Sequence, residues 1–313
     1  MSQMKAVRIH EYGGANVLKL EPMDRPEPGD GEVLIRVFAT TVNPFDCAVR
    51  AGYMAAYIKH TFPHVLGTDA AGVIEAVGPG VTSFKRGDKV YAMGGVSRAG
   101  TYAEYAVVPA TDVAAAPGSL DNVHAAAVPH VTLTAWQALI EMAGLTKGQT
   151  VLVHGAAGGV GHMAVQLAKW RGAKVIGTAS TNFDFLRELN VDQAIDYSAT
   201  PFESAAGQVD VVLDTVGGDT QERSWKVLKP GGMLVSTIQA PTAETAAAHS
   251  ARGAMVWSMP SIGKVLAEVA ALVDSGKLKP HVSAVLPLDE VARAHTMIEG
   301  RHTRGKLVLQ VAA

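Results

Sequence analysis

Short hydrophobic runs separated by turn residues dominate the first part of the chain. The runs Val33–Val37, Gly72–Gly78 and Lys89–Met93 are rich in β-branched residues and are typical of strands. Proline, glycine and acidic residues at 28–32 predict a turn before the first of these runs. This pattern predicts a small β-rich domain or partial barrel over residues 1–122.

After residue 122 the hydrophobic pattern lengthens and alternates between strands and helices. Thr150–His154 is an apolar run suited to a buried parallel strand, Gly161–Arg171 has the apolar spacing of a helix, and Lys174–Thr178 is the next strand. The same alternation continues in the strands Val209–Asp214 and Met233–Thr237, the helix Gln221–Val227 and the turn at 229–232. Such alternation predicts an α/β fold, a doubly wound Rossmann sheet with helices on both faces, over residues 123–256.

The composition excludes several classes of protein. The chain of 313 residues is 48% hydrophobic and 18% charged, with a formal net charge of −2. This balance gives no positive field for nucleic acid or anionic lipid, so neither partner is expected. With Cys47 as its one cysteine, the chain cannot form an internal disulfide or a thiolate-rich metal site. The N-terminus shows no signal peptide and no apolar stretch reaches membrane-spanning length, so we expect a reduced, cytoplasmic protein.

A glycine-rich turn joins the first buried strand to the following helix. It reads His-Gly-Ala-Ala-Gly-Gly-Val-Gly over residues 154–161, with Ala156 where a strict G-x-G-x-x-G motif has its first glycine. Glycine permits a tight turn, brings backbone close to a pyrophosphate and lets helix and strand pack closely. Between a strand and a helix the motif predicts a dinucleotide site, and a tight turn without a ligand is the alternative.

The residues after the second strand predict the type of dinucleotide. NAD-binding folds place a carboxylate there to hold the ribose diol, whereas this chain has hydroxyl and amide side chains in Thr178-Ala-Ser-Thr-Asn182. These groups can bond a 2′-phosphate that a carboxylate would repel, so NADPH is the expected cofactor. Asp184 is nearby, and we expect it to cap the following helix.

Several motifs together resemble the quinone oxidoreductase (zeta-crystallin-like) branch of the medium-chain dehydrogenase/reductase superfamily. The likeness runs nearly end to end, through Val42–Asp46, Leu66–Gly72, Lys85–Val90, His154–Gly161, Asp196–Tyr197, Leu228–Gly232 and His302–Lys306. It implies a GroES-like catalytic domain built from both chain ends, residues 1–122 completed by 257–313, around the Rossmann domain. It also implies a homodimer.

Zinc alcohol dehydrogenases resemble this chain in fold, so the zinc ligands are the distinguishing feature. Their catalytic site needs a cysteine where this chain has Asn43 or a neighbouring residue, and a Gly-His-Glu where it has Gly67-Thr68-Asp69. Their structural zinc needs four cysteines, which this chain lacks. We therefore expect no metal, and we interpret His60 and His64 as surface or loop residues.

The resemblance also implies site residues. Asn43, Asp46 and Tyr53 form the expected catalytic set. Tyr53 is similar in placement to the family's candidate proton donor, although Tyr57 is a rival and Tyr53 is equally consistent with simple packing. The residues expected to contact the cofactor are Asn43, Thr134, Ala157, Gly158, Gly159, Val160, Thr178, Ser180, Tyr197, Val216, Thr237, Arg304 and Lys306. For Arg304 and Lys306 the alternative is a solvated charge near the chain's end.

Without a Lewis acid nothing stabilises the alkoxide of a simple alcohol, whereas hydride adds readily to a conjugated, electrophilic carbon. The expected activity is therefore zinc-independent reduction of quinones or α,β-unsaturated carbonyls by NADPH. An enoyl-thioester reductase of the same superfamily is one alternative. A non-enzymatic NADPH-binding structural or RNA-binding protein is another, which the net charge disfavours.

Overall fold

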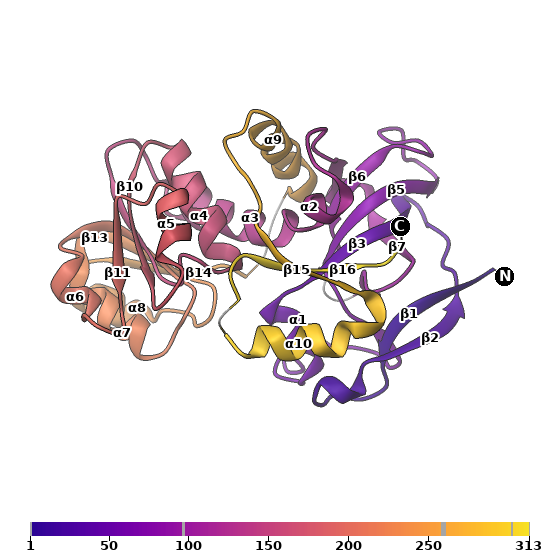
Figure 1. Ribbon diagram of the computed structural model, residues 1–313, viewed down its shortest axis with the longest axis horizontal. Coiled ribbons are helices and arrows are strands. Elements are labelled where there is room, and N and C mark those ends of the chain that lie inside the picture. The colour runs from indigo at the N-terminus through magenta and orange to yellow at the C-terminus, as the bar shows by residue number, and fades with distance from the viewer. Residues whose placement is uncertain (1, 96–97, 258–260, 302, 313) are drawn as a thin grey trace. The chain divides into compact units, whose positions relative to one another are not determined.

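The computed structural model describes residues 2–95, 98–257, 261–301 and 303–312. The chain forms two compact units (Figure 1). One comprises residues 1–130, 261–275 and 280–313, and the other comprises residues 131–260 and 276–279. No helix among the described residues is long and apolar enough to cross a membrane.

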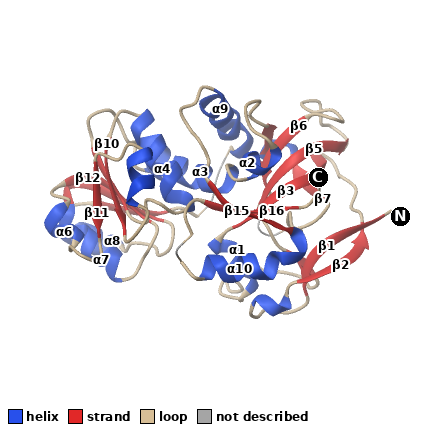
Figure 2. Ribbon diagram, in the orientation of Figure 1, coloured by secondary structure: helices blue, strands red, loops and turns tan. Residues whose placement is uncertain are grey.

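The first unit is rich in strands (Figure 2). Its helices and strands are β1 (Gln3–Ile9), β2 (Lys19–Asp24), β3 (Glu32–Val42), α1 (Pro44–Arg50), β4 (His64–Val65), β5 (Asp69–Val77), β6 (Lys89–Met93), β7 (Tyr105–Pro109), β8 (Val113–Ala115), α2 (Asn122–Ala126), α9 (Ile262–Asp274), β15 (Val282–Pro287), α10 (Val291–Glu299) and β16 (Lys306–Gln310). A seven-stranded sheet has the order β15-β16-β3-β5-β6-β8, with β7 also paired to β3. A second sheet has the order β2-β1-β4.

The C-terminal strand β16 brings the end of the chain against β3. The two strands are antiparallel, and Leu307 lies opposite Val42. On the other side of β3, strand β5 runs antiparallel with Ala39 opposite Ala71. The end of β3, the start of β5 and the start of β16 therefore meet, which places Asn43, Asp69 and Lys306 in one region.

The second unit contains a parallel sheet. Its elements are α3 (Pro129–Trp136), which begins at the end of the first unit, a π-helix (Gln137–Met142), β9 (Thr150–Val153), α4 (Gly159–Trp170), β10 (Lys174–Ala179), α5 (Phe183–Glu188), β11 (Gln193–Asp196), α6 (Phe202–Ala205), β12 (Val209–Asp214), α7 (Asp219–Ser224), β13 (Leu228–Ser236), α8 (Ala243–Ala248) and β14 (Arg252–Met255). The strands are parallel in the order β11-β10-β9-β12-β13-β14.

Side-chain alternation explains why helices cover both faces of this sheet. Leu152, Ile176 and Val212 lie in register on neighbouring strands and pack with Phe202 of α6 and Trp225 just after α7. The intervening residues point to the opposite face, where α4 contacts β9 and β10. The predicted α/β class with a doubly wound parallel sheet is confirmed.

Some local predictions differ from the structure. The sequence-based domain boundaries fall at 122 and 256, whereas the units divide at 130 and 260. Helix α2 contacts β3 and β5, and so belongs to the first unit. Residues 276–279 belong to the second unit, where Gln166 of α4 accepts from the Lys279 amide at 2.8 Å.

Two further predictions were wrong in detail. The expected turn at 229–232 is part of β13, where the pairing with β12 shifts register. Asp184 does not cap α5, because the cap position is taken by Asn182 in a left-handed conformation. Asp184 instead lies inside the first turn and pairs with Arg187.

Candidate active site

The glycine-rich turn has the geometry that an anion site requires. Gly155 has a φ of +64°, and a Cβ at Gly161 would lie 2.1 Å from the Gly155 carbonyl oxygen. Helix α4 therefore begins directly against the turn. Its N-cap, Gly158, supplies no side-chain acceptor, and the first turn carries no acidic residue. The amides of Gly159 and Val160 lie at the positive helix end without intrahelical acceptors, as an incoming phosphate requires.

Polar and apolar residues follow the carboxyl ends of the strands in the second unit. Tyr197 after β11 is 52% exposed and Val216 after β12 is 49% exposed. The Tyr197 hydroxyl donates to Ser180 Oγ at 3.1 Å, so these predicted adenosine-side residues lie together. The Thr237 amide donates to the Asp214 carbonyl at 3.0 Å, which holds the end of β13 beside β12. In parallel α/β sheets this edge is where ligands bind.

Two other predicted cofactor residues are buried. Thr134 on α3 is 4% exposed and Thr178 at the end of β10 is 1% exposed. The Thr178 hydroxyl lies 3.1 Å from His154 Nδ1 and accepts from the Gly155 amide at 3.4 Å. The buried hydroxyl of Thr178 is therefore bonded to the glycine-rich turn, and it is not available to bind a 2′-phosphate as the sequence predicted.

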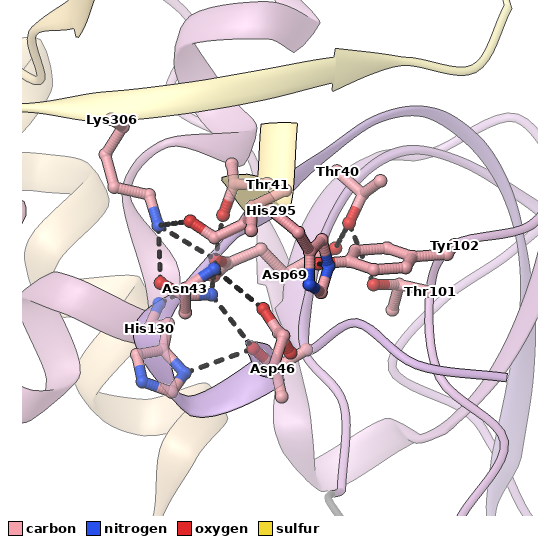
Figure 3. Close-up of polar contacts among 12 residues, drawn as sticks. Thr40, Thr41, Asn43, Asp46, Asp69, Thr101, Tyr102, His130, His295 and Lys306 are labelled. Carbon is pink, nitrogen blue, oxygen red and sulfur yellow. Dashed lines mark hydrogen bonds and ion pairs between the residues drawn. The ribbon is translucent and has the colours of Figure 1, made fainter. Parts of the chain in front are cut away.

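In the first unit, a buried polar network surrounds Asn43 (Figure 3). Asn43 caps α1, and its amide N–H donates to Asp46 Oδ2 at 2.7 Å. The Asn43 side-chain amide donates to Asp69 Oδ2 at 3.0 Å and to Thr68 Oγ1 at 3.3 Å. Asp69 Oδ1 accepts from the His130 amide at 2.7 Å. The sequence-predicted pair Asn43 and Asp46 is thus brought together at the start of one helix.

Lys306 supplies the positive charge of this network. Its ammonium donates to Asn43 Oδ1 and to the Val42 carbonyl, and lies 3.6 Å from Asp69 Oδ2. Both Lys306 and Asp69 are almost fully buried, at 2% and 0% exposure. A buried charge persists only when it is paired and hydrogen-bonded. Lys306 is therefore an interior cation, and not a solvated charge near the end of the chain.

Burial shifts the protonation equilibria of the network. Burial raises the pKa of Asp46 to about 7, the Asn43 N–H opposes this, and the Asp69 charge adds to it. Burial lowers the pKa of His130 to about 4, against the attraction of Asp69. The pKa of Lys306 is also lowered by burial, against the attraction of Asp69 and Asp46. The network therefore contains one carboxyl group that titrates near neutral pH.

The remaining predicted residues lie outside the network. Tyr53 and Tyr57 are 79% and 72% exposed. Arg304 donates through Nε to His281 Nε2 at 2.9 Å. This bond joins the segment before β16 to the segment before β15. Neither tyrosine forms part of the packed core of the unit.

Asp69, Thr68 and His130 are absent from the predicted site residues, although the structure joins all three to Asn43. His130 Nδ1 lies 3.1 Å from Thr68 Oγ1. The available signal was the single carboxylate in the run Leu66–Gly72, since an aspartate next to small apolar residues must find buried donors.

Within residues 2–95, 98–257, 261–301 and 303–312, no cluster of three or more His, Cys, Asp or Glu side chains is placed to hold a metal ion. His64 is 8% exposed, so its interpretation as a surface residue was wrong. Its ring lies tilted against that of His60 with 4.3 Å between centroids, and burial lowers the pKa of His64 to about 4.

Comparison with known proteins gives a consistent picture. Residues 29–118 match the alcohol dehydrogenase GroES-like domain, and residues 189–309 match the family described as zinc-binding dehydrogenase. The chain is 35% identical to a quinone oxidoreductase of Pongo abelii, covering 98% of this chain and 97% of that protein. It is 36% identical to a 2-methylene-furan-3-one reductase of Solanum lycopersicum, covering 98% and 79%.

A solved structure agrees with these relatives. The quinone oxidoreductase from Coxiella burnetii superimposes with a TM-score of 0.90 at 34% identity, covering 99% of this chain and 100% of that one. The matched sequence and fold together span both units. The chain therefore belongs to the medium-chain dehydrogenase/reductase superfamily, in its quinone oxidoreductase branch.

Proposed function

We propose that this protein is an NADPH-dependent reductase of quinones or α,β-unsaturated carbonyls that works without zinc. The observation that carries the proposal is the network of Asn43, Asp69 and Lys306, in which an ammonium supplies the buried positive charge. The printed names of the relatives support the same substrate class. A 2-methylene-furan-3-one carries a C=C bond conjugated to a ketone, and a quinone is a conjugated diketone.

The second unit fits a dinucleotide. Gly158, Gly159 and Val160 would hold the pyrophosphate at the uncapped end of α4, and the clash that a Cβ at Gly161 would make shows why the turn must be glycine-rich. Ser180 and Tyr197 would hold the adenosine end. When bound, the reduced nicotinamide supplies a hydride from its C4.

The network of the first unit selects the kind of acceptor. Among the described residues, no group of three or more His, Cys, Asp or Glu side chains is placed to hold a metal ion, and the carboxylate of Asp69 is already paired with Lys306. The residues can orient an acceptor and stabilise developing charge by hydrogen bonds. An acceptor that is already electrophilic through conjugation needs no stronger activation.

The preference for NADPH rests on the end of β10. Ser180 is the acceptor of the Tyr197 hydroxyl bond, and no carboxylate lies between Thr178 and Asn182 to hold a ribose diol. Fluorescence titration of both reduced cofactors tests this preference. Tighter binding of NADPH than of NADH is expected, and equal affinities for the two cofactors would contradict the proposed preference.

Reduction of a conjugated carbonyl also requires a proton, and Tyr53 is the proposed donor. Tyr53 and Tyr57 are exposed residues of the same segment, so each serves as the other's control. Tyr53→Phe is expected to lower kcat by about 100-fold, as loss of a general acid does, while Tyr57→Phe leaves kcat unchanged. The opposite result would assign the proton to Tyr57, and two unaffected variants would assign it to water.

Steady-state kinetics test the activity itself. A small quinone and a short enone should each oxidise NADPH, and a crotonyl thioester should be the poorer acceptor. Activity should persist after dialysis against a chelator. Gly158→Asp should abolish cofactor binding, because a carboxylate would face the pyrophosphate. Gly158→Ala is the matched control, because it adds a Cβ 3.2 Å from the Gly155 carbonyl oxygen but no charge. If no acceptor oxidised NADPH above background, or if chelation removed the activity, the proposal would fail.

A further inference from the structure

His154 opens the glycine-rich turn and is a buried histidine without a role in the mechanism above. It directly follows β9 and is 1% exposed. Its ring contacts side chains from two other elements: Nδ1 lies 3.1 Å from Thr178 Oγ1 at the end of β10, and Nε2 lies 2.9 Å from Ser224 Oγ on α7. Phe202 packs edge-on against the ring at 4.6 Å between centroids.

The hydrogen bonds around His154 can run in only one direction. The Ser224 hydroxyl donates its single proton to the Thr220 carbonyl at 2.6 Å, so it must accept from His154 Nε2–H. Nδ1 of the neutral ring is then an acceptor, and the Thr178 hydroxyl donates to it. Thr178 Oγ1 in turn accepts from the Gly155 amide at 3.4 Å. A continuous chain of four hydrogen bonds therefore links the glycine turn to α7.

The backbone of His154 fixes a third segment. Its carbonyl accepts from Thr215 Oγ1 at 2.8 Å, and its amide donates to the Leu213 carbonyl at 3.0 Å. Thr215 in turn restricts Gly155, because a Cβ at Gly155 would lie 2.7 Å from Thr215 Oγ1. One residue, His154, thus joins the glycine-rich turn, the end of β10 and the loop after β12.

We propose that His154 is a positioning residue for dinucleotide binding, which holds Gly155 through Thr178 so that the amides at the start of α4 face the pyrophosphate. This inference rests on the proposed cofactor. Ser224 cannot act with His154 as a nucleophile, because its proton is directed to Thr220 and it is fully buried. The burial of the ring also lowers the pKa of His154 to about 4, so the ring stays neutral and keeps its acceptor at neutral pH.

Two hydroxyl deletions on opposite sides of the ring separate positioning from stability. Thr178→Val removes the bond toward the glycine turn, and Ser224→Ala removes the bond toward α7. Both residues are buried, so each deletion leaves one ring nitrogen unpaired and both variants should lose thermal stability. Thr178→Val should weaken NADPH and 2′,5′-ADP binding by about tenfold, whereas Ser224→Ala should change each affinity by less than about twofold.

His154→Asn gives a second test if either deletion fails to fold. The asparagine oxygen takes the place of Nδ1 and can accept from Thr178, but nothing reaches Ser224. This variant should bind NADPH with nearly the affinity of the wild-type protein, while His154→Phe should bind about tenfold more weakly. Affinities are measured at one temperature below all the melting transitions. Equal affinities across the variants, or losses that follow only the melting temperatures, would overturn the positioning role. A wild-type protein that binds neither NADPH nor 2′,5′-ADP would instead overturn the proposed function.

Discussion

The substitution Asp46→Asn isolates the cost of burying a carboxyl group beside Asn43. Asp46 is 2% exposed, and its Oδ2 accepts from the Asn43 amide at 2.7 Å. An asparagine retains the shape and one oxygen acceptor, so it can still accept that bond while removing the charge. The difference in stability between the two proteins should therefore report the ionisation of Asp46.

The sign and size of the effect follow from the pKa. Burial raises the pKa of Asp46 from 3.8 to about 7, so between these values the folded protein holds a proton that the unfolded chain releases. The stability that this proton contributes is fully present below pH 3.8 and is lost as the pH rises through about 7. The change in the pKa of Asp46 from 3.8 to about 7 corresponds to at most about 4 kcal/mol of stability.

Urea unfolding of the wild-type protein and D46N across this pH range tests the reasoning. Relative to D46N, the wild-type protein should lose several kcal/mol on going from low pH to slightly alkaline pH. Asp274→Asn is the control in the same unit, because the Ser119 hydrogen bonds lower the pKa of Asp274. The ionised carboxylate of Asp274 should therefore stabilise the protein above its unfolded pKa, and this contribution is lost on acidification. Relative to D274N, the wild-type protein should lose stability as the pH falls, which is the opposite of its trend relative to D46N. Parallel pH profiles for the wild-type protein and D46N would refute the account of Asp46.

Three further substitutions test other parts of the structure. Lys306→Met should lower the free energy of unfolding by about 3 kcal/mol, because it leaves the buried Asp69 charge without its cation, and a loss below about 1 kcal/mol in urea unfolding would contradict this. Gly161→Ala places a Cβ 2.1 Å from the Gly155 carbonyl, so NADPH affinity measured by fluorescence should fall more than about tenfold, and unchanged affinity would show that the turn adapts. Ser180→Asp should weaken NADPH and strengthen NADH in parallel titrations, because a carboxylate repels a 2′-phosphate and accepts from a ribose diol; an unchanged ratio would place the 2′-phosphate elsewhere.

The fold of the second unit could be predicted because its strands are buried on both faces. The apolar cores Val175–Gly177 and Val211–Leu213 predict buried strands, and the structure has strands β10 and β12 around them. The unit boundaries could not be predicted in the same way. Asn122–Ala126 is helical like the segments that follow it, and only its packing on β3 and β5 assigns it to the first unit.

The candidate site was predictable where its chemistry is local in sequence. The glycine turn of residues 154–161 is such a case, since one short segment contains the strand end, the turn and the helix start. The pairing of Lys306 with Asn43 joins residues separated by 263 positions. His154 likewise depends on Ser224, 70 positions away. No linear pattern encodes such contacts, because they arise only when β16 pairs with β3 or when α7 packs on β12, the strand next to β9.

For the proposed reduction, the charge balance of the buried network limits the acceptors that it can serve. Lys306 contributes one positive charge and Asp69 one negative charge at 3.6 Å, so this pair leaves little net field. Asp46 adds a second negative charge as the pH rises through about 7. The network therefore has no surplus positive charge with which to polarise an unactivated carbonyl or to stabilise an alkoxide, in contrast to a metal ion acting as a Lewis acid. Acceptors whose own conjugation spreads the incoming charge should consequently react faster than saturated ketones, and increasingly so above the pKa of Asp46.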